Sequence, residues 1–224
     1  MAFLVESFER IQKELSAHNV KLVAVTKTKP VADILEAYNA GHRDFAENYV
    51  QELLDKYEAL PKDIRWHFIG HLQSNKAKYI APFIHLIQGV DSEKLLSEIN
   101  KQGAKIHRVI PCLLQVHISA EETKFGLDEH ELDLLMKKME MNTALWKNIS
   151  VKGLMGMASF TEDNDLVRSE FKFLKTLFDK YAEFTMSNRA FSILSMGMSA
   201  DYRFGIEAGS NMVRIGSLLF GTRN

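Results

Sequence analysis

The sequence predicts an α/β protein built as a single (β/α)8 TIM barrel. Strand-like and helix-like segments alternate along the chain, and this alternation is typical of parallel β-structure. Eight strand-like segments in 224 residues suit a compact barrel of this kind. A doubly wound open sheet is the alternative, but no G-x-G-x-x-G follows the first strand-like segment.

The predicted strands are short apolar runs, several of them rich in β-branched or aromatic residues. They span residues 21–27, 44–48, 65–70, 85–90, 109–118, 150–157, 190–197 and 212–216. Amphipathic patterns predict helices between most of these strands, over residues 31–40, 49–59, 73–81, 92–102, 128–140 and 163–184. Apolar residues at helical spacing from Phe3 to Leu15 predict an additional helix that covers the barrel.

Local signals mark some of the helix ends. Ser92 precedes the acidic start of one predicted helix and is expected to cap it. Gly41 and Gly103 lie where two of the helices are expected to end.

Composition excludes several partners. A net charge of −1 and a pI of about 6.7 predict no nucleic-acid partner and no membrane partner. The first residues do not resemble a signal peptide, and no run reaches the ~20 apolar residues of a membrane span, so we expect a cytoplasmic protein.

The single cysteine, Cys112, lies in an apolar run and is expected to be buried. We expect one domain over residues 1–224 and a monomer, because no large exposed apolar helix face is evident.

Lys27 is the first candidate for chemistry, because the active sites of such barrels lie at the C-terminal ends of the strands. Strand alternation places Val23, Val25 and Lys27 on one face, with the amine at the barrel mouth. A desolvated lysine can attack a carbonyl and form a Schiff base. The alternative is a strand-end lysine whose ammonium lies in water. Pro30 indicates that the strand stops before Lys29.

Residues 195–217 predict a phosphate site. They contain four glycines and several hydroxyl residues, in the loops after the last two strands, where such barrels frequently bind phosphate. Ser199 is expected to cap a short helix, and Gly216 and Ser217 to provide close backbone approach and a donor. Ordinary glycine and serine turns are the alternative.

Arg214 should point into the same mouth, since it lies two residues before Gly216. A buried arginine needs a partner, which is either a core carboxylate or the ring nitrogen of a ligand that it keeps unprotonated. A carbonyl, a phosphate and an aromatic ring are all present in pyridoxal 5′-phosphate (PLP).

The chain resembles the pyridoxal phosphate homeostasis proteins in segments that cover nearly its whole length. These segments are "AVTKTKP" (24–30), "FAENYVQE" (45–52), "WHFIGHLQSNK" (66–76), "GLMGM" (153–157), "SMGMSAD" (195–201) and "GSNMVRIGSLLFG" (209–221). The resemblance implies a barrel like the cofactor domain of alanine racemase, with PLP held as an internal aldimine on Lys27. It also implies that Arg214 faces the pyridine nitrogen and that Asn48 lies beside the cofactor. The phosphate is expected on Ser195, Gly216 and Ser217.

The same resemblance implies regulation of the intracellular PLP supply and of amino- and keto-acid balance, with PLP-dependent apoenzymes as candidate partners. A PLP racemase needs an acid or base on each face of the cofactor, and in alanine racemase the second one comes from another domain. The predicted barrel uses the chain to about residue 221, so a carrier is expected instead of an enzyme. A PLP enzyme acting on an unidentified amino acid and a Schiff-base aldolase acting on a sugar phosphate stay open.

Two further questions concern histidines and lysines. His67 and His71 would lie ~13 Å apart on a strand, too far to share a metal ion, so no metal site is predicted. Whether Lys29 or Lys124 also binds PLP transiently, during transfer to an apoenzyme, is left open by the sequence.

Overall fold

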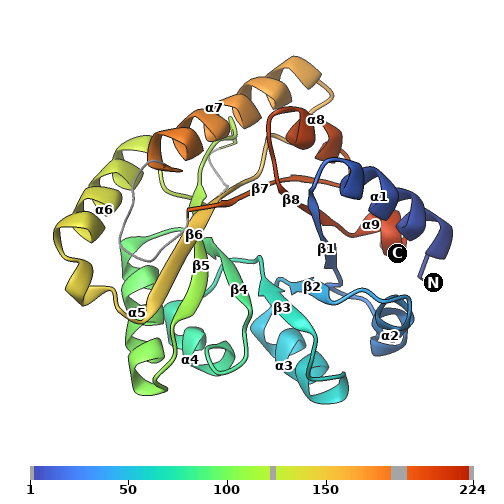
Figure 1. Ribbon diagram of the computed structural model, residues 1–224, viewed down its shortest axis with the longest axis horizontal. Helices are drawn as coiled ribbons and strands as arrows, with labels where there is room; N and C mark the ends of the chain where they lie inside the picture. The colour runs from blue at the N-terminus through green and yellow to red at the C-terminus, as the bar shows by residue number, and fades with distance from the viewer. Residues whose placement is uncertain (1–2, 122–124, 183–190, 222–224) are drawn as a thin grey trace.

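Eight parallel strands close into a barrel in the computed structural model, which describes residues 3–121, 125–182 and 191–221. Each strand pairs with the next along the chain, and the last pairs with the first (Figure 1). The strands are β1 (Lys21–Val25), β2 (Asp44–Glu47), β3 (Arg65–Phe68), β4 (Leu86–Val90), β5 (Ile110–Val116), β6 (Ile149–Gly156), β7 (Ile193–Met198) and β8 (Met212–Ile215). The predicted (β/α)8 barrel is confirmed, and the open sheet is excluded.

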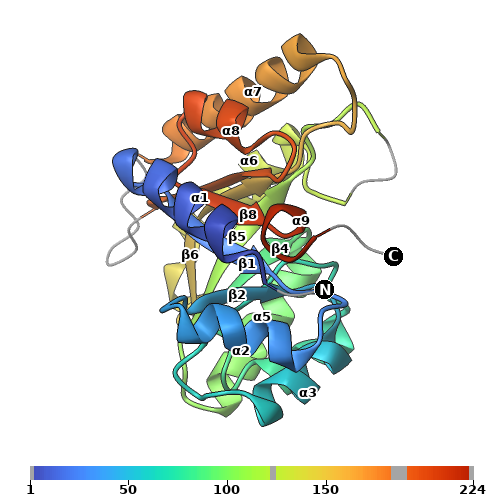
Figure 2. The same ribbon diagram turned by 90° about the vertical axis from the view of Figure 1, so that its right-hand side faces the viewer.

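Helices surround this barrel (Figures 1 and 2). They are α1 (Val5–Ala17), α2 (Val31–Asn39), α3 (Val50–Ala59), α4 (Ala77–Ile80), α5 (Glu93–Lys105), α6 (Glu129–Met141), α7 (Asn164–Ala182), α8 (Tyr202–Glu207) and α9 (Ser217–Phe220), with 3-10 turns at Ser74–Lys76 and Thr143–Leu145. Helices α1 and α9 lie side by side, and the Leu4 amide donates to the Leu219 carbonyl oxygen at 2.8 Å.

The helix boundaries agree with some of the sequence signals. Ser92 caps α5, since its hydroxyl accepts from the Leu95 amide at 3.3 Å, and Gly41 follows α2 with a φ of +94°. The expectation for Gly103 was wrong, because α5 continues through it to Lys105. A Cβ at Gly103 would lie 2.6 Å from the carbonyl oxygens of Arg108 and Asn148, so close backbone packing explains this glycine. The start of the predicted strand over 190–197 and the end of the predicted helix over 163–184 lie outside the described residues.

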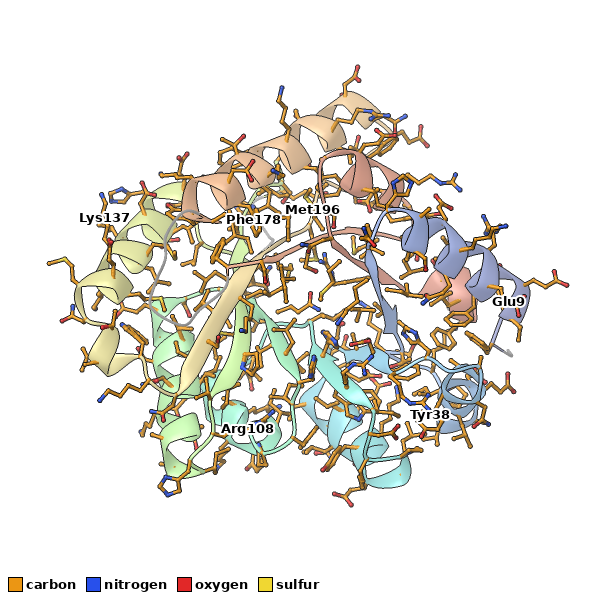
Figure 3. The ribbon with its side chains drawn as sticks, in the orientation of Figure 1. Glu9, Tyr38, Arg108, Lys137, Phe178 and Met196 are labelled. Atoms are coloured by element: carbon orange, nitrogen blue, oxygen red, sulfur yellow. The ribbon has the colours of Figure 1, made fainter. Side chains whose placement is uncertain are left out.

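Apolar side chains form two separate cores. The larger one lies between the strands and the helices and includes Cys112, which is buried as predicted. In Figure 3, Phe178 and Met196 lie in this layer, while Lys137 points outward from α6. The smaller core fills the barrel itself and consists of Val23, Ala46, Leu86, Leu113, Met155 and Met212. This filled interior places any ligand cavity at the ends of the strands.

Candidate functional site

A cavity of about 540 Å³ lies where the strands end in sequence. It is lined by the loops that follow β1, β2, β6, β7 and β8. Five of the six predicted cofactor residues line it: Lys27, Asn48, Arg214, Gly216 and Ser217. The barrel therefore gathers residues that are up to 190 positions apart around one space.

Lys27 lies in a turn, two residues beyond the end of β1. The strand stops early because Thr28 has a φ of +65°, and the Lys29 amide donates back to the Thr26 carbonyl oxygen at 2.9 Å. Val25, at the end of β1, packs on the barrel core and also lines the cavity. The predicted face is thus correct, although the backbone that presents the lysine is a turn rather than a strand.

A buried ionic cluster, here called the Lys56 cluster (Thr26, Glu47, Glu52 and Lys56), holds this turn from behind. The Lys56 ammonium donates to the Thr26 carbonyl oxygen at 2.7 Å, to Glu47 at 2.6 Å and to Glu52 at 2.7 Å. Glu47 also accepts from the Thr26 hydroxyl at 2.6 Å, and Glu52 accepts from the Thr28 amide at 2.6 Å. Side chains of β2 and α3 therefore fix the backbone on both sides of Lys27.

Glu47 is the most deeply buried ionisable member of the Lys56 cluster. Burial raises the pKa of Glu47 to about 7, against the lowering effects of Lys56 and Thr26. Its second carboxylate oxygen, Oε2, is buried and has no hydrogen-bond partner among the described residues. At neutral pH the ionised and the protonated forms of Glu47 are therefore both populated.

Lys29 holds a different part of the site together. Its ammonium donates to the carbonyl oxygens of Phe220 and Gly221, at 2.7 and 3.2 Å. These contacts tie the turn after β1 to the end of α9. Lys124, the other lysine left open by the sequence, lies outside the described residues.

Arg214 is almost completely buried, with 2% of its surface exposed. Its Nη1 donates to the carbonyl oxygen and the hydroxyl of Ser195, at 2.9 and 2.6 Å, and its Nη2 donates to the Gly156 carbonyl oxygen at 3.0 Å. These bonds use three of the five N–H groups of a guanidinium. Burial lowers the pKa of Arg214 to about 10, against an opposing effect of Asp201, so the side chain stays cationic at neutral pH.

Ser195 lies below Arg214, inside the barrel. It is fully buried, accepts from Arg214 and donates its hydroxyl to Gln88 Oε1 at 2.7 Å. Because β7 continues to Met198, the loop at the cavity begins only at Ser199. The contact of Ser195 with a phosphate stays a prediction. The Ser195 hydroxyl already accepts one hydrogen bond, from Arg214, and donates another, to Gln88.

Ser199 lines the cavity, whereas Ser195 does not. The Ser199 hydroxyl accepts from the Gly216 amide at 3.2 Å, and both residues line the cavity beside Ser217. The expected cap of α8 is therefore not made by Ser199, because Asp201 is the residue at the start of that helix. The two loops of the predicted phosphate site are joined directly by this bond.

Asn48 carries an unsatisfied polar atom. Its side-chain oxygen, Oδ1, is buried without a hydrogen-bond partner among the described residues. A buried acceptor without a donor costs about 1–3 kcal/mol. Gly70 allows this arrangement, because a Cβ there would lie 2.2 Å from the Asn48 carbonyl oxygen. An acceptor held in this way fits a ligand that brings its own hydroxyl donor.

His67 and His71 contact different carboxylates. His71 is bound to Asp91, at 2.7 Å, whereas His67 lies inside the barrel 3.1 Å from Asp44. The ligand atoms of Asp44, His67 and His85 come within 4.8 Å of one another, a grouping that the sequence analysis missed. Arg65 already binds both oxygens of Asp44, so this carboxylate serves an ion pair.

Helices long and apolar enough to cross a membrane do not occur in the part of the chain that the structure describes.

The fold and the cavity define a barrel of the alanine racemase type, with a lysine, an arginine and two glycine- and serine-rich loops at its mouth. The sequence model of the family described as "Alanine racemase, N-terminal domain" matches residues 4–224. Curated relatives narrow this class further, and the chain belongs to the pyridoxal phosphate homeostasis protein family.

The relatives are similar over most of both chains. The pyridoxal phosphate homeostasis protein of Aquifex aeolicus is 41% identical, over 96% of this chain and 94% of its own length. The human protein of that name is 37% identical, over 98% of this chain and 82% of its own length.

Solved structures show the same barrel. PipY of Synechococcus elongatus is 30% identical to this chain, and the match covers 96% of this chain and 99% of PipY. The TM-score is 0.89 for the PipY structure without PLP and 0.85 for the structure with PLP bound. Alanine racemase from Bartonella henselae, 17% identical with a TM-score of 0.70, shares the fold. This chain covers 60% of that racemase.

Proposed function

We propose that this protein binds PLP in the cavity at the strand ends, that the Lys27 amine holds its aldehyde covalently, and that the protein maintains the PLP supply without substantial turnover. The observation that carries the proposal is the convergence of Lys27, Asn48, Arg214 and the Gly216–Ser217 loop on one cavity. The names of the relatives and the PLP bound to PipY support it.

The residues present fit each part of the cofactor. Arg214 has two N–H groups not used in its three hydrogen bonds, and one of them can donate to a ring nitrogen. Asn48 Oδ1 can accept from a ring hydroxyl, which would satisfy its buried lone pairs. The hydroxyls of Ser199 and Ser217 can donate to a phosphate, and the Gly216 amide can join them by giving up its 3.2 Å bond to Ser199.

When bound, PLP supplies an electrophilic carbon and an aromatic ring that can withdraw electrons. A cationic Arg214 beside the ring nitrogen disfavours protonation of that nitrogen, and this weakens electron withdrawal by the ring. The arrangement therefore favours holding the cofactor over activating a substrate on it.

The cavity wall also supports a carrier. Among the described residues, the ionisable side chains that line it are Lys27, Lys29, Asp201 and Arg214. Lys29 donates to two backbone carbonyl oxygens, and Asp201 accepts from the Met198 amide at 2.6 Å. No tyrosine, histidine or cysteine within the described ranges lines the cavity to act as the second acid or base of a racemase.

The proposal is tested by the visible absorption of the purified protein with and without PLP. Borohydride reduction and peptide mapping then identify the modified lysine. We expect a yellow protein with the cofactor on Lys27, loss of the colour in Lys27→Ala and its retention in Lys29→Ala. Modification of another residue in the wild type would contradict the role of Lys27. Steady racemisation of an amino acid by the pure protein would contradict the role as a carrier.

A further inference from the structure

A continuous line of buried side chains crosses the barrel from the cavity to its opposite end. Arg214 Nη1 lies 2.6 Å from Ser195 Oγ, and Ser195 Oγ lies 2.7 Å from Gln88 Oε1. Gln88 Nε2 lies 3.0 Å from His67 Nδ1, and His67 Nε2 lies 3.1 Å from Asp44 Oδ1. Each residue comes from a different strand, and none is more than 4% exposed. We call these five residues the barrel chain.

The carboxylate at one end fixes the direction of the first bonds. Burial acts to raise the pKa of Asp44, but hydrogen bonds from His67 and Arg65 hold it well below its usual range, so Asp44 is ionised. An ionised carboxylate only accepts, and His67 must therefore carry its proton on Nε2. In a neutral imidazole, Nδ1 is then an acceptor, and Gln88 must turn its amide nitrogen toward it.

The remaining bonds follow from this orientation. With its nitrogen on His67, Gln88 presents its oxygen to Ser195, and the Ser195 hydroxyl donates to that oxygen. The lone pairs of Ser195 are left to accept from Arg214. All donors thus run in one direction, from the cationic guanidinium to the anionic carboxylate.

We propose that Gln88 and His67 are positioning residues for Arg214, because the barrel chain fixes the guanidinium with its two remaining N–H groups available to a ring nitrogen. The benefit to the ligand rests on the proposed function, whereas the order of the bonds does not require a ligand. If the Ser195 hydroxyl could turn, its hydrogen could point toward Arg214 instead of Gln88, and the guanidinium would then lose one fixed acceptor.

The surroundings of His67 keep the barrel chain in this order. Burial lowers the pKa of His67, Asp44 opposes this effect, and the nearby cations Lys21 and Arg65 add to it. A second proton on His67 would set its Nδ1–H against the Gln88 amide nitrogen. The amide would then have to turn and would present a donor to Ser195.

The first test measures the tautomer of His67 in the wild-type protein without PLP, by long-range ¹H–¹⁵N correlation NMR. We expect a neutral ring protonated on Nε2 from about pH 6 to 8. A ring protonated on Nδ1, or an imidazolium ion, would overturn the order of the bonds. This measurement stands even if the protein does not bind PLP, so it separates the present inference from the proposed function.

The second test removes the central link in the PLP-loaded full-length protein. We expect Gln88→Leu to bind PLP about tenfold more weakly, and the ¹⁵N shift of labelled PLP to move toward that of a protonated ring. Leu86→Ala, in the barrel core but outside the barrel chain, is the control: it should lower the thermal midpoint and leave the ring-nitrogen shift in place. Unchanged affinity and shift in Gln88→Leu would overturn the proposal.

A near-isosteric variant covers the case in which Gln88→Leu does not fold. In Gln88→Glu the new carboxylate can only accept, so His67 Nδ1 must carry a proton. We expect His67 to become an imidazolium ion at neutral pH in this variant. A neutral His67 there would show that residue 88 does not set the direction of the barrel chain. Failure of the wild type to form a yellow complex would instead refute the proposed function.

Discussion

The ammonium of Lys29 lies 2.7 Å from the carbonyl oxygen of Phe220, and this contact joins the turn that carries Lys27 to the last described helix. Lys29, two residues after the candidate PLP lysine, therefore stabilises the fold through this contact. We expect Lys29→Ala to lose about 1.5–3 kcal/mol of unfolding free energy, because two carbonyl oxygens lose a charged donor. Denaturant unfolding measures this loss. Lys175→Ala, which removes an exposed pair with Asp179 within one helix, should cost under about 1 kcal/mol. Equal losses in the two variants would contradict a special role for Lys29.

Replacing Asn48 should have opposite effects on stability and on binding. Its Oδ1 lacks a partner among the described residues, so Asn48→Ala removes an unsatisfied acceptor and should leave the thermal midpoint of the PLP-free protein unchanged or raised. The same change should weaken PLP binding about tenfold, since the ligand hydroxyl loses its acceptor. Calorimetry and a PLP titration measure the two effects. A lower midpoint with unaltered affinity would show that Asn48 is structural.

The raised pKa of Glu47 predicts that the stability of the protein depends on pH, and one substitution can isolate this effect. Its pKa is about 7 in the folded protein, against 4.5 for an unperturbed side chain. Between these values the folded state binds more protons than the unfolded state, so the contribution of Glu47 to stability falls as pH rises from about 4.5 to 7. The full change is about 3 kcal/mol.

The measurement compares Glu47→Gln with the wild type by urea unfolding at several pH values. The buried histidines His42 and His67, whose pKa values are lowered, change stability in the opposite direction near the same pH. Because both proteins carry them, the difference between the two curves removes their effect. We expect Glu47→Gln to gain stability relative to the wild type as pH rises. A difference that is constant with pH would mean that Glu47 titrates normally.

Gly70→Ala should damage the site through the backbone of Asn48. The added Cβ would lie 2.2 Å from the Asn48 carbonyl oxygen, which is backbone and cannot move aside cheaply. We expect the free energy of unfolding to fall by about 2–4 kcal/mol and PLP to bind more weakly. Gly41→Ala is the control: no atom lies within 4 Å, but the φ of +94° is unfavourable for alanine. It should cost about 1 kcal/mol and leave PLP affinity intact.

The sequence predicts the architecture well because strand and helix periodicities differ and alternate without interruption. The positions of Lys27, Asn48, Arg214, Gly216 and Ser217 follow from this, since a residue at the C-terminal end of a parallel strand must lie at the mouth of the barrel.

Positions that depend on local backbone geometry were harder to predict from the sequence. Nothing in the letters "TKTKP" shows that Thr28 adopts a positive φ, which makes Lys27 part of a turn. Ser195 and Ser199 are both serines near a strand end, and only the length of β7 decides which one reaches the cavity.

The barrel chain was hidden for a different reason. Gln88 and Ser195 are 107 residues apart, and their contact depends on how far each strand is shifted along the barrel axis relative to its neighbours. That shift is set by packing of the whole core, so no local pattern around Gln88 reveals it. A glutamine within an apolar strand is nevertheless a visible signal, because a buried amide requires partners.

The pairing of β8 with β1 has a consequence for biosynthesis. The first strand leaves the ribosome long before its neighbour β8, and the Lys27 turn acquires its Lys29–Phe220 contact only when the last helix has been made. An incomplete chain would thus present its lysine without the arginine and the glycine- and serine-rich loops that come from residues 195–217. On the proposed function, truncated products would therefore lack most of the residues that hold the cofactor.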